Sequence, residues 1–371
     1  MTGLLHLQYK KGIHYPSLDG LRGLAVILVF IFHTMSYVQI FRLGWIGVDL
    51  FFVLSGFLIT GILYDSKKDD RYYRNFIFRR ALRIFPLYFF FILLMIWVLP
   101  TLFPAVFTDM SYYQEHQGWY WFYISNWLPL STSVKSSTVL DHLWSLSIEE
   151  QFYICWPFII LFFQGRILIK ICLFLIACAI MIRYTGAPLL GHIKYFEYSN
   201  TFTRVDSLLI GALISILYRL KPVILLRSAL PVLLVSAVVI VAIILRQKKL
   251  DFTNLIDTFT LWDLFFGAIL IFSISQKNNW LKSLLGTKVF KFFGKYSYGL
   301  YIYHQPINKL MYDKVIGPMH LNFPFLPILA TIVCLGMSIL IALLSYNLIE
   351  MPFLRLKKYF EPINHQPVNL S

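Results

Sequence analysis

The chain has 371 residues, of which 58% are hydrophobic and 14% are charged, and its mean hydropathy is +0.68. A soluble domain usually carries about 25% charged residues, so this composition excludes an ordinary soluble enzyme and indicates a protein with several membrane spans. The formal net charge of +15 would suit nucleic-acid binding, but the basic residues fall between apolar runs, so we expect no nucleic-acid partner and assign them to membrane topology and anionic lipid.

Apolar runs of about 20 residues, the length that crosses a bilayer, recur along the chain. The segments predicted as spans are 21–40, 44–64, 78–99, 144–163, 167–184, 205–220, 223–245, 255–275, 297–312 and 326–349. An even number of spans puts both termini on one side, and a cytoplasmic N-terminus places most of the 33 Lys and Arg residues in cytoplasmic segments, the loop at 246–249 being the clear exception. We therefore predict an all-α polytopic membrane protein with about ten transmembrane helices and both termini cytoplasmic.

A single integral-membrane domain is predicted over residues 1–371, with a core at 18–357 and a short cytoplasmic tail at 358–371. No cleavable signal peptide is expected, because a full-length span follows the first basic residues without a small-residue cleavage site. The four cysteines all lie inside apolar runs, so the sequence predicts neither a disulfide framework nor a metal site.

The first predicted span carries ionisable side chains at both ends. Arg22 and His33 are eleven residues apart, which places them on one helix face about 16 Å apart, and Asp19 lies near the same face. An ionisable group in hydrocarbon is costly, so His33 is expected to face the protein interior. A histidine packed against a neighbouring helix is the alternative to a functional group, and we favour the functional interpretation.

The longest predicted extracytoplasmic loop, 100–141, is rich in tyrosine and tryptophan. Such residues form belts at membrane interfaces. Their rings also stack on the apolar faces of sugars, so a glycan-facing platform explains the same composition equally well. The sequence leaves both interpretations open.

The fourth predicted span opens with a second cluster of polar residues. His142, Ser145 and Glu149 share one helix face, and Glu149 lies about 10 Å deeper than His142. His33 reaches a similar depth from the other side, so we predict that Glu149 orients His33 as a general base. A structural ion pair between the first and fourth spans is the alternative.

Arginines gather at the cytoplasmic end of the third predicted span. Arg80 and Arg83 share a face, with Arg79 adjacent. Planar guanidinium groups suit bidentate recognition of phosphate, whereas ordinary positive-inside charge is the alternative. Nothing resembles a P-loop or dinucleotide fingerprint, so a phosphorylated ligand would be held by side chains.

Weaker signals lie at other span ends. Asp206 accompanies Arg204 at the outer end of the sixth span, and His304 lies among tyrosines in the ninth. Each also fits a capped or paired helix end. Together with Asp19 and His142, Asp206 and His304 are our substrate-side candidates.

Several segments occur together in an order that resembles the membrane acyltransferase type 3 family, over residues Leu18 to about Lys357. They are Arg22 with His33 after ten intervening residues, GVDLFFVLSGFLIT, RRALRIFP, FYISNW, HLWSLSIEEQFY, TRVDSLLIGA, SYGLYIYHQP and SYNLIEMP. The resemblance implies about ten transmembrane helices and transfer of an acyl group, often acetyl, from cytoplasmic acyl-coenzyme A to a glycan or other acceptor. By motif match, His33 becomes the catalytic histidine and Arg22 its partner, and Arg80 and Arg83 match the cytoplasmic arginine pair. Some relatives carry a C-terminal esterase-like domain, and the chain resembles the form without it.

We therefore expect an O-acyltransferase of the bacterial inner membrane that moves an acyl group, in the first place acetyl, from acyl-CoA to a sugar hydroxyl. The acceptor is expected to be a surface polysaccharide such as the O-antigen of lipopolysaccharide, and no cofactor is expected to stay bound. Arg79, Arg80 and Arg83 would hold the nucleotide, the pantetheine arm would reach His33, and His33 would act as general base or be transiently acylated.

Membrane proteins of another class remain as alternatives. A proton-coupled transporter or flippase would also use intramembrane His and Glu residues and a basic mouth. A purely structural scaffold fits poorly with the charged face of the first span. Release of free coenzyme A that depends on substrate distinguishes the enzyme from both.

Overall fold

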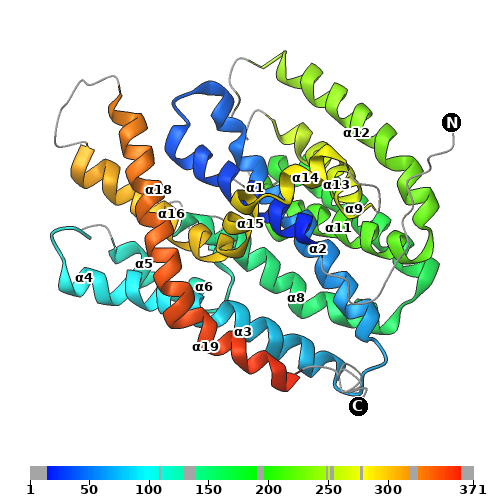
Figure 1. Ribbon diagram of the computed structural model, residues 1–371, viewed down its shortest axis with the longest axis horizontal. Coiled ribbons are helices and arrows are strands. Elements are labelled where there is room, and N and C mark those ends of the chain that lie inside the picture. Colours follow the sequence, from blue (N-terminus) through cyan, green and yellow to red (C-terminus); the bar gives the residue numbers. More distant parts are fainter. Residues whose placement is uncertain are drawn as a thin grey trace.

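The computed structural model describes residues 15–107, 110–128, 139–189, 196–247, 250, 255–275, 279–316 and 325–360 (Figure 1). Within these ranges every regular element is a helix, which confirms the all-α prediction. Lys248 and Lys249 of the exceptional basic loop lie outside the described residues, as does the tail from residue 361 onward.

A helix overlaps each of the ten predicted spans. These helices are α1 (Pro16–Met35), α2 (Ile46–Ser66), α3 (Tyr72–Leu93), α8 (Trp144–Phe162), α9 (Gly165–Leu189), α11 (Thr201–Leu220), α12 (Pro222–Ile244), α13 (Phe259–Ile274), α16 (Ser297–Leu310) and α18 (Leu326–Ser345). Shorter helices include α4 (Leu99–Leu102), α5 (Ser111–Glu115), α6 (Gln117–Trp121), α10 (Phe196–Ser199), α14 (Trp280–Leu285), α15 (Lys288–Lys295) and α19 (Met351–Arg355).

Eight helical segments of the described chain are long and apolar enough to cross a membrane, so the chain is a polytopic membrane protein. The helices α8 and α16 are not among them, because α8 carries Glu149 and Glu150 and α16 has only 14 residues. The count of ten spans and the cytoplasmic placement of both termini therefore stay predictions.

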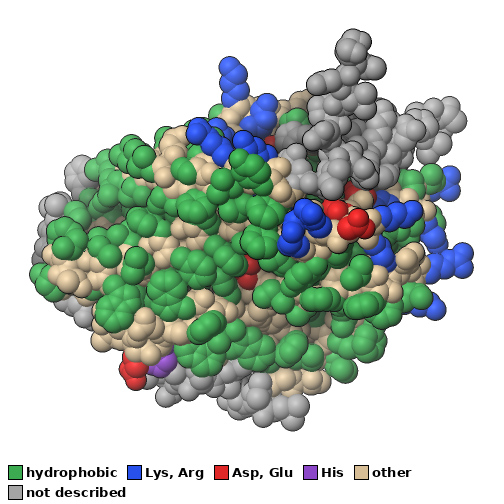
Figure 2. Space-filling model, turned by 90° about the horizontal axis from the view of Figure 1, so that it is seen from below, with side chains coloured by type: hydrophobic (Ala, Val, Ile, Leu, Met, Phe, Trp, Pro, Cys, Tyr) green, Lys and Arg blue, Asp and Glu red, His purple; other side chains and the backbone are tan. Residues whose placement is uncertain are grey.

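The helices divide into a buried centre and an apolar periphery. Most of α2 and α11 is buried, whereas most residues of α9, α12 and α18 are half-buried or exposed. In Figure 1, α12 runs along one edge of the molecule and α18 crosses the opposite side. Figure 2 shows a broad hydrophobic face, with basic side chains gathered along its upper and right-hand edges. Exposed apolar helices around a polar centre are what a lipid environment requires.

Glycines let the central helices approach each other at backbone distance. On α2, Gly56 lies against the carbonyl of Leu208, and on α11, Gly211 lies against the carbonyl of Val53, so a Cβ at either glycine would overlap the neighbouring backbone. Small residues at helix contacts are the usual means of close packing in membranes. This contact fixes α2, and with it one wall of the cavity described next.

Candidate active site

A polar cavity lies among α1, α2, α3, α8 and α16, and we call it the arginine cavity. Its lining includes Arg22, Ser55, Arg80, Arg83, Ser145, Glu149, Tyr153, Tyr298 and Tyr301, together with apolar residues of α2, α3 and α8. Tyr153, Glu149 and Ser145 follow each other about one turn apart along α8, so the cavity extends along that helix.

Charge in the arginine cavity is mainly positive. The guanidinium of Arg80 lies 5.6 Å from the centre of the Tyr153 ring, and Arg22 pairs with Asp19 at 3.8 Å. The only carboxylate that lines the cavity in the described chain is Glu149, whose Oε1 accepts a hydrogen bond of 2.6 Å from the Ser55 hydroxyl. Three guanidinium groups facing one carboxylate leave the cavity able to bind an anion.

A second pocket opens at the far end of α1, and we call it the histidine pocket. It is lined by His33, Thr34, Ser36, Tyr37, Asp141, Gln305, Asn308, Lys309, Tyr312 and Asp313. His33 lies in the last turn of α1, whereas Arg22 lies near its first turns, so the two cavities are about 16 Å apart along this helix.

The imidazole ring of His33, which lines the histidine pocket, contacts the ring of His304. His33 Nδ1 lies 2.9 Å from the carbonyl of Val29 and 3.2 Å from His304 Nε2, and His304 Nδ1 lies 2.6 Å from the carbonyl of Tyr301. Because a carbonyl only accepts, both Nδ1 atoms carry hydrogen. His33 Nε2 therefore keeps its lone pair, which is the atom that a general base needs.

A third histidine and two hydroxyls separate the two cavities. His142 Nε2 donates to the carbonyl of Ile302 at 3.1 Å, and its ring centre lies 5.3 Å from that of His304. Tyr301 Oη donates to the His142 carbonyl at 2.8 Å and lies 2.6 Å from Ser145 Oγ. We call the residues His33, His304, His142, Tyr301 and Ser145 the histidine cluster. His33 lines the histidine pocket, whereas Tyr301 and Ser145 line the arginine cavity, so the cluster reaches from one cavity to the other.

The structure does not bring Glu149 to His33. The hydrogen bonds of the His33 ring go to Val29 and His304, while Glu149 bonds to Ser55 inside the arginine cavity. The sequence prediction that Glu149 orients His33 is therefore corrected, and His304 holds that place. Helix arithmetic gave both side chains a similar depth but did not give the direction in which each points.

Most of the other predicted site residues also lie at the arginine cavity or in the histidine cluster. Arg22, Arg80 and Arg83 line the arginine cavity, whereas Arg79 is not part of its lining. Among the substrate-side candidates, His142 and His304 belong to the histidine cluster, and Asp19 lies beside Arg22.

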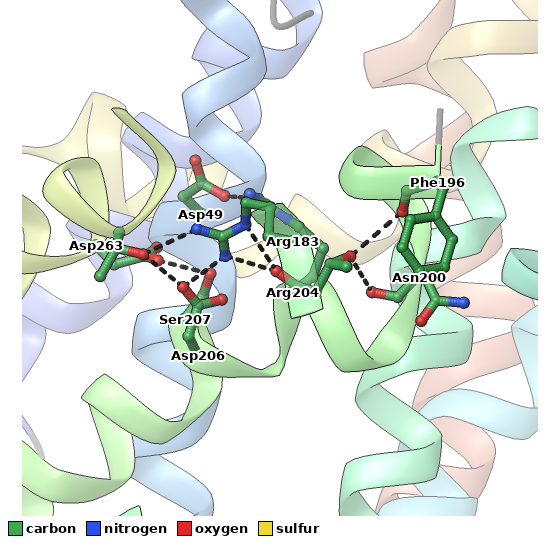
Figure 3. Close-up of polar contacts among 10 residues, drawn as sticks. Asp49, Arg183, Phe196, Asn200, Arg204, Asp206, Ser207 and Asp263 are labelled. Carbon is green, nitrogen blue, oxygen red and sulfur yellow. Dashed lines mark hydrogen bonds and ion pairs between the residues drawn. The ribbon is translucent and has the colours of Figure 1, made fainter. Parts of the chain in front are cut away.

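Asp206 belongs instead to a buried charge network between α2, α9, α11 and α13 (Figure 3). It pairs with Arg183 at 2.6 Å, and Asp49 pairs with Arg204, while Asp263 lies in the same group. All five side chains are buried, and none of them lines either cavity. The sequence analysis did not single out Asp49, Arg183 or Asp263. Each is an ionisable residue inside an apolar run, and that pattern could have identified them as members of a buried polar site.

The aromatic residues of the loop before α8 serve largely as packing. Tyr113, Tyr120 and Tyr123 are buried. The ring of Tyr123 stacks on Tyr88 of α3 with centres 4.1 Å apart. Neither the interfacial belt nor the sugar platform describes these three tyrosines, because burial in the core removes them from both lipid and glycan.

Comparison with known proteins places the chain among acyltransferases. The family described as "Acyltransferase domain" matches residues 15–347. The peptidoglycan O-acetyltransferase OatA of Listeria monocytogenes is 30% identical over 365 residues, which cover 91% of this chain and 56% of OatA. A candidate peptidoglycan O-acetyltransferase of Bacillus subtilis, YrhL, is 31% identical over 93% of this chain and 56% of its own length. A candidate O-acetyltransferase of Staphylococcus aureus strain COL is 28% identical over 97% of this chain and 60% of its own length. The chain thus spans a little over half the length of these relatives, and no solved structure matches it.

Proposed function

The chain belongs to the acyltransferase domain family, and from that membership we propose that it moves an acetyl group from acetyl-CoA in the cytoplasm to a sugar hydroxyl on the opposite side of the membrane. The observation that carries the proposal is the pair of cavities joined by the histidine cluster. A basic cavity suits the charged donor, and a pocket with a histidine base suits a hydroxyl acceptor.

The donor is assigned to the arginine cavity. Coenzyme A carries several phosphates, which Arg22, Arg80 and Arg83 would bind near the cytoplasmic mouth predicted by the positive-inside rule. Phosphates are too costly to bury in the membrane, whereas the slender pantetheine arm can follow α8 toward Ser145 and Tyr301. The thioester would then lie next to the histidine cluster.

The acceptor is assigned to the histidine pocket, with its hydroxyl against His33 Nε2. His33 removes the hydroxyl proton, the oxygen bonds to the acyl carbon, and the carbon–sulfur bond of the thioester breaks. A transient acyl group on His33 is a second route that uses the same atoms. In both routes His304 holds the His33 ring through its 3.2 Å contact with Nδ1.

The relatives and the polar lining of the pocket support a glycan acceptor. The names of two relatives specify peptidoglycan, so a peptidoglycan sugar is the first acceptor to test, and the O-antigen of lipopolysaccharide is the second. Asp141, Asn308 and Lys309 would supply hydrogen bonds to sugar hydroxyls. A bacterial inner-membrane location agrees with both acceptors.

Arginine variants test the donor assignment. We expect Arg80→Ala and Arg83→Ala each to raise the KM for acetyl-CoA by about tenfold or more, because each removes a charge-assisted hydrogen bond to phosphate. Arg79→Ala is the matched control, since it removes an equal charge from the same helix without touching the cavity. Steady-state kinetics of radiolabelled acetyl transfer in membrane vesicles measure the effect. Equal changes in all three variants would contradict a specific donor site.

A proton-coupled transporter or flippase remains the rival, because it would use the same buried histidines and basic mouth. The fate of the radiolabelled acetyl group distinguishes acyl transfer from transport. Radiolabel that becomes covalently attached to sugar, with release of free coenzyme A, supports acyl transfer, whereas movement of an unmodified substrate across the vesicle membrane would replace the proposed function with transport.

A further inference from the structure

Two tyrosines, Tyr37 and Tyr312, form part of the wall of the histidine pocket. Tyr37 is 52% exposed, and the side chain of Tyr312 is half-buried. In the part of the chain that the structure describes, neither ring stacks on another aromatic ring, whereas the buried Tyr123 stacks on Tyr88. Apolar ring surface is thus left uncovered at a pocket whose other lining residues are polar.

A hydrogen bond holds the turn that carries Tyr37 close to His33. Arg42 Nε donates to the carbonyl of Ser36 at 2.9 Å, which ties the short helix η1 (Gln39–Trp45) back to the end of α1. The turn between the two helices carries Tyr37. Because Tyr37 follows His33 by four residues, about one helical turn, a sugar with a hydroxyl at His33 Nε2 would lie within reach of the Tyr37 ring.

The opposite end of the chain brings Tyr312 to the same pocket. Tyr312 and Asp313 belong to a π-helical turn, η7 (Met311–Ile316), that continues α16. Turns of this kind are frequent at functional sites. Tyr312 Oη donates to the carbonyl of Thr34 at 3.3 Å, which anchors its ring to the last turn of α1. The tyrosines therefore reach the pocket from the two helices whose histidines contact each other.

Charge distinguishes the histidine pocket from the arginine cavity. Its described lining contains two carboxylates, Asp141 and Asp313, and one ammonium group, Lys309. Lys309 Nζ pairs with Asp313 at 2.7 Å, and Asp141 accepts a hydrogen bond of 3.3 Å from Tyr113 Oη. Carboxylates accept hydrogen bonds from sugar hydroxyls but repel a ligand that carries a carboxylate or phosphate of its own. The lining therefore favours a neutral ligand.

We propose, resting on the proposed function, that the histidine pocket binds a neutral hexopyranose unit of the acceptor glycan and that Tyr37 stacks on the apolar face of its ring. The C–H groups of a pyranose with equatorial hydroxyls form such a face, which an aromatic ring covers without any hydrogen bond. Tyr312 bounds the same site, and the polar residues of the pocket bind the hydroxyls. Tyr37 thus determines specificity, and it takes no part in proton removal by His33.

Tyr37→Leu removes the ring and is the main test variant. Tyr37 is not part of the hydrophobic core, so the substitution leaves the fold intact. Tyr37→Phe keeps the stacking face and loses only the hydroxyl. Tyr184→Leu is the matched control, because Tyr184 is 53% exposed and lines neither cavity.

The first experiment measures acetyl transfer by the full chain in sealed vesicles, with radiolabelled acetyl-CoA inside and N-acetylated chitotetraose outside. We expect Tyr37→Leu to raise the KM for the sugar by about three- to tenfold, the size of one aromatic contact, and to change kcat by less than about twofold. Tyr37→Phe and Tyr184→Leu should keep the wild-type KM. A lower kcat at unchanged KM, or equal changes in Tyr37→Leu and Tyr184→Leu, would overturn the stacking role.

The second experiment measures sugar binding without the donor, by saturation-transfer NMR of the full chain in lipid nanodiscs. Cellotetraose and the β-1,4-linked tetramer of glucuronic acid share ring and linkage, but only the second is acidic. We expect the acidic tetramer to bind about fivefold or more weakly than cellotetraose. Tyr37→Leu should weaken binding of cellotetraose and of chitotetraose. Equal binding of the neutral and acidic tetramers would overturn the preference for a neutral sugar.

The two readouts separate this inference from the proposed function. Acetyl transfer to chitotetraose with no effect of Tyr37→Leu on KM or on binding would overturn the stacking site and leave acyl transfer intact. Binding of chitotetraose that depends on Tyr37, without any acetyl transfer by the wild-type protein, would support the sugar site and count against the proposed function. Neither binding nor transfer would overturn both.

Discussion

His33→Ala is expected to lower acyl transfer by about 10²- to 10⁴-fold, the usual contribution of a general base. The ring of His33 lines the histidine pocket, and its Nδ1 is held by the Val29 carbonyl and by His304, which leaves Nε2 for the acceptor hydroxyl. Removal of the ring takes away the base without disturbing the donor cavity. The KM for acetyl-CoA should therefore stay close to the wild-type value while kcat falls.

His116→Ala is the matched control for this substitution. Its Nδ1 bonds to the carbonyl of Tyr112, four residues earlier, in the same way that His33 bonds to Val29, but it lines neither cavity. Radiolabelled acetyl transfer in vesicles, at matched amounts of inserted protein, measures both variants. Full activity of His33→Ala would make His33 a packing residue, which is the alternative that the sequence left open.

Arg204→Leu is expected to destabilise the protein by about 3–5 kcal/mol, because it leaves the buried Asp49 carboxylate without its partner. Both side chains of this pair are fully buried, and the Arg204 guanidinium lies 4.3 Å from the centre of the Phe259 ring. The pair joins α2 to α11, so its loss should also disturb the wall of the arginine cavity. Thermal unfolding of the purified protein in detergent, followed by intrinsic fluorescence, measures the loss.

Arg219→Leu provides the comparison, because its pair with Asp65 joins the same two helices near their other end and is partly exposed. It should cost no more than about 1 kcal/mol. Combining Arg204→Leu with Asp49→Asn should recover part of the stability, since the second change removes the uncompensated charge. Equal decreases in melting temperature for Arg204→Leu and Arg219→Leu would show that burial does not make the pair of Arg204 and Asp49 more important for stability than the partly exposed pair.

The length of the apolar runs was enough to predict the helices and to place Arg22 and His33 on one of them. A run of about 20 apolar residues has few alternatives to a helix in lipid, because every backbone group must be paired internally. The spacing along α1 then determined the distance between the two side chains. These parts of the fold follow from local chemistry, and the structure confirms them.

The partners of these side chains could not be predicted in the same way. Which helix faces His33 depends on how all the helices pack, and α16 rather than α8 supplies its neighbour, His304. Arg183 of α9 and Asp206 of α11 likewise form a pair between two helices, and the apolar runs that predict each helix do not predict this contact. Arg22 and His33 lie on one helix, so their eleven-residue spacing could be read from the sequence. Each of these other contacts joins two different helices, and the sequence alone does not give the relative placement of the helices.

The central claim is that this protein attaches an acyl group covalently to a surface glycan, and one measurement tests it most directly. Peptidoglycan and lipopolysaccharide are isolated from cells that express the wild-type protein or His33→Ala at equal membrane levels, and their fragments are compared by mass spectrometry. The account predicts fragments heavier by one acetyl group in wild-type cells alone. Fragments without the added acetyl group in both samples would contradict it, whereas acetylated fragments in both would leave acyl transfer standing and make His33 a packing residue.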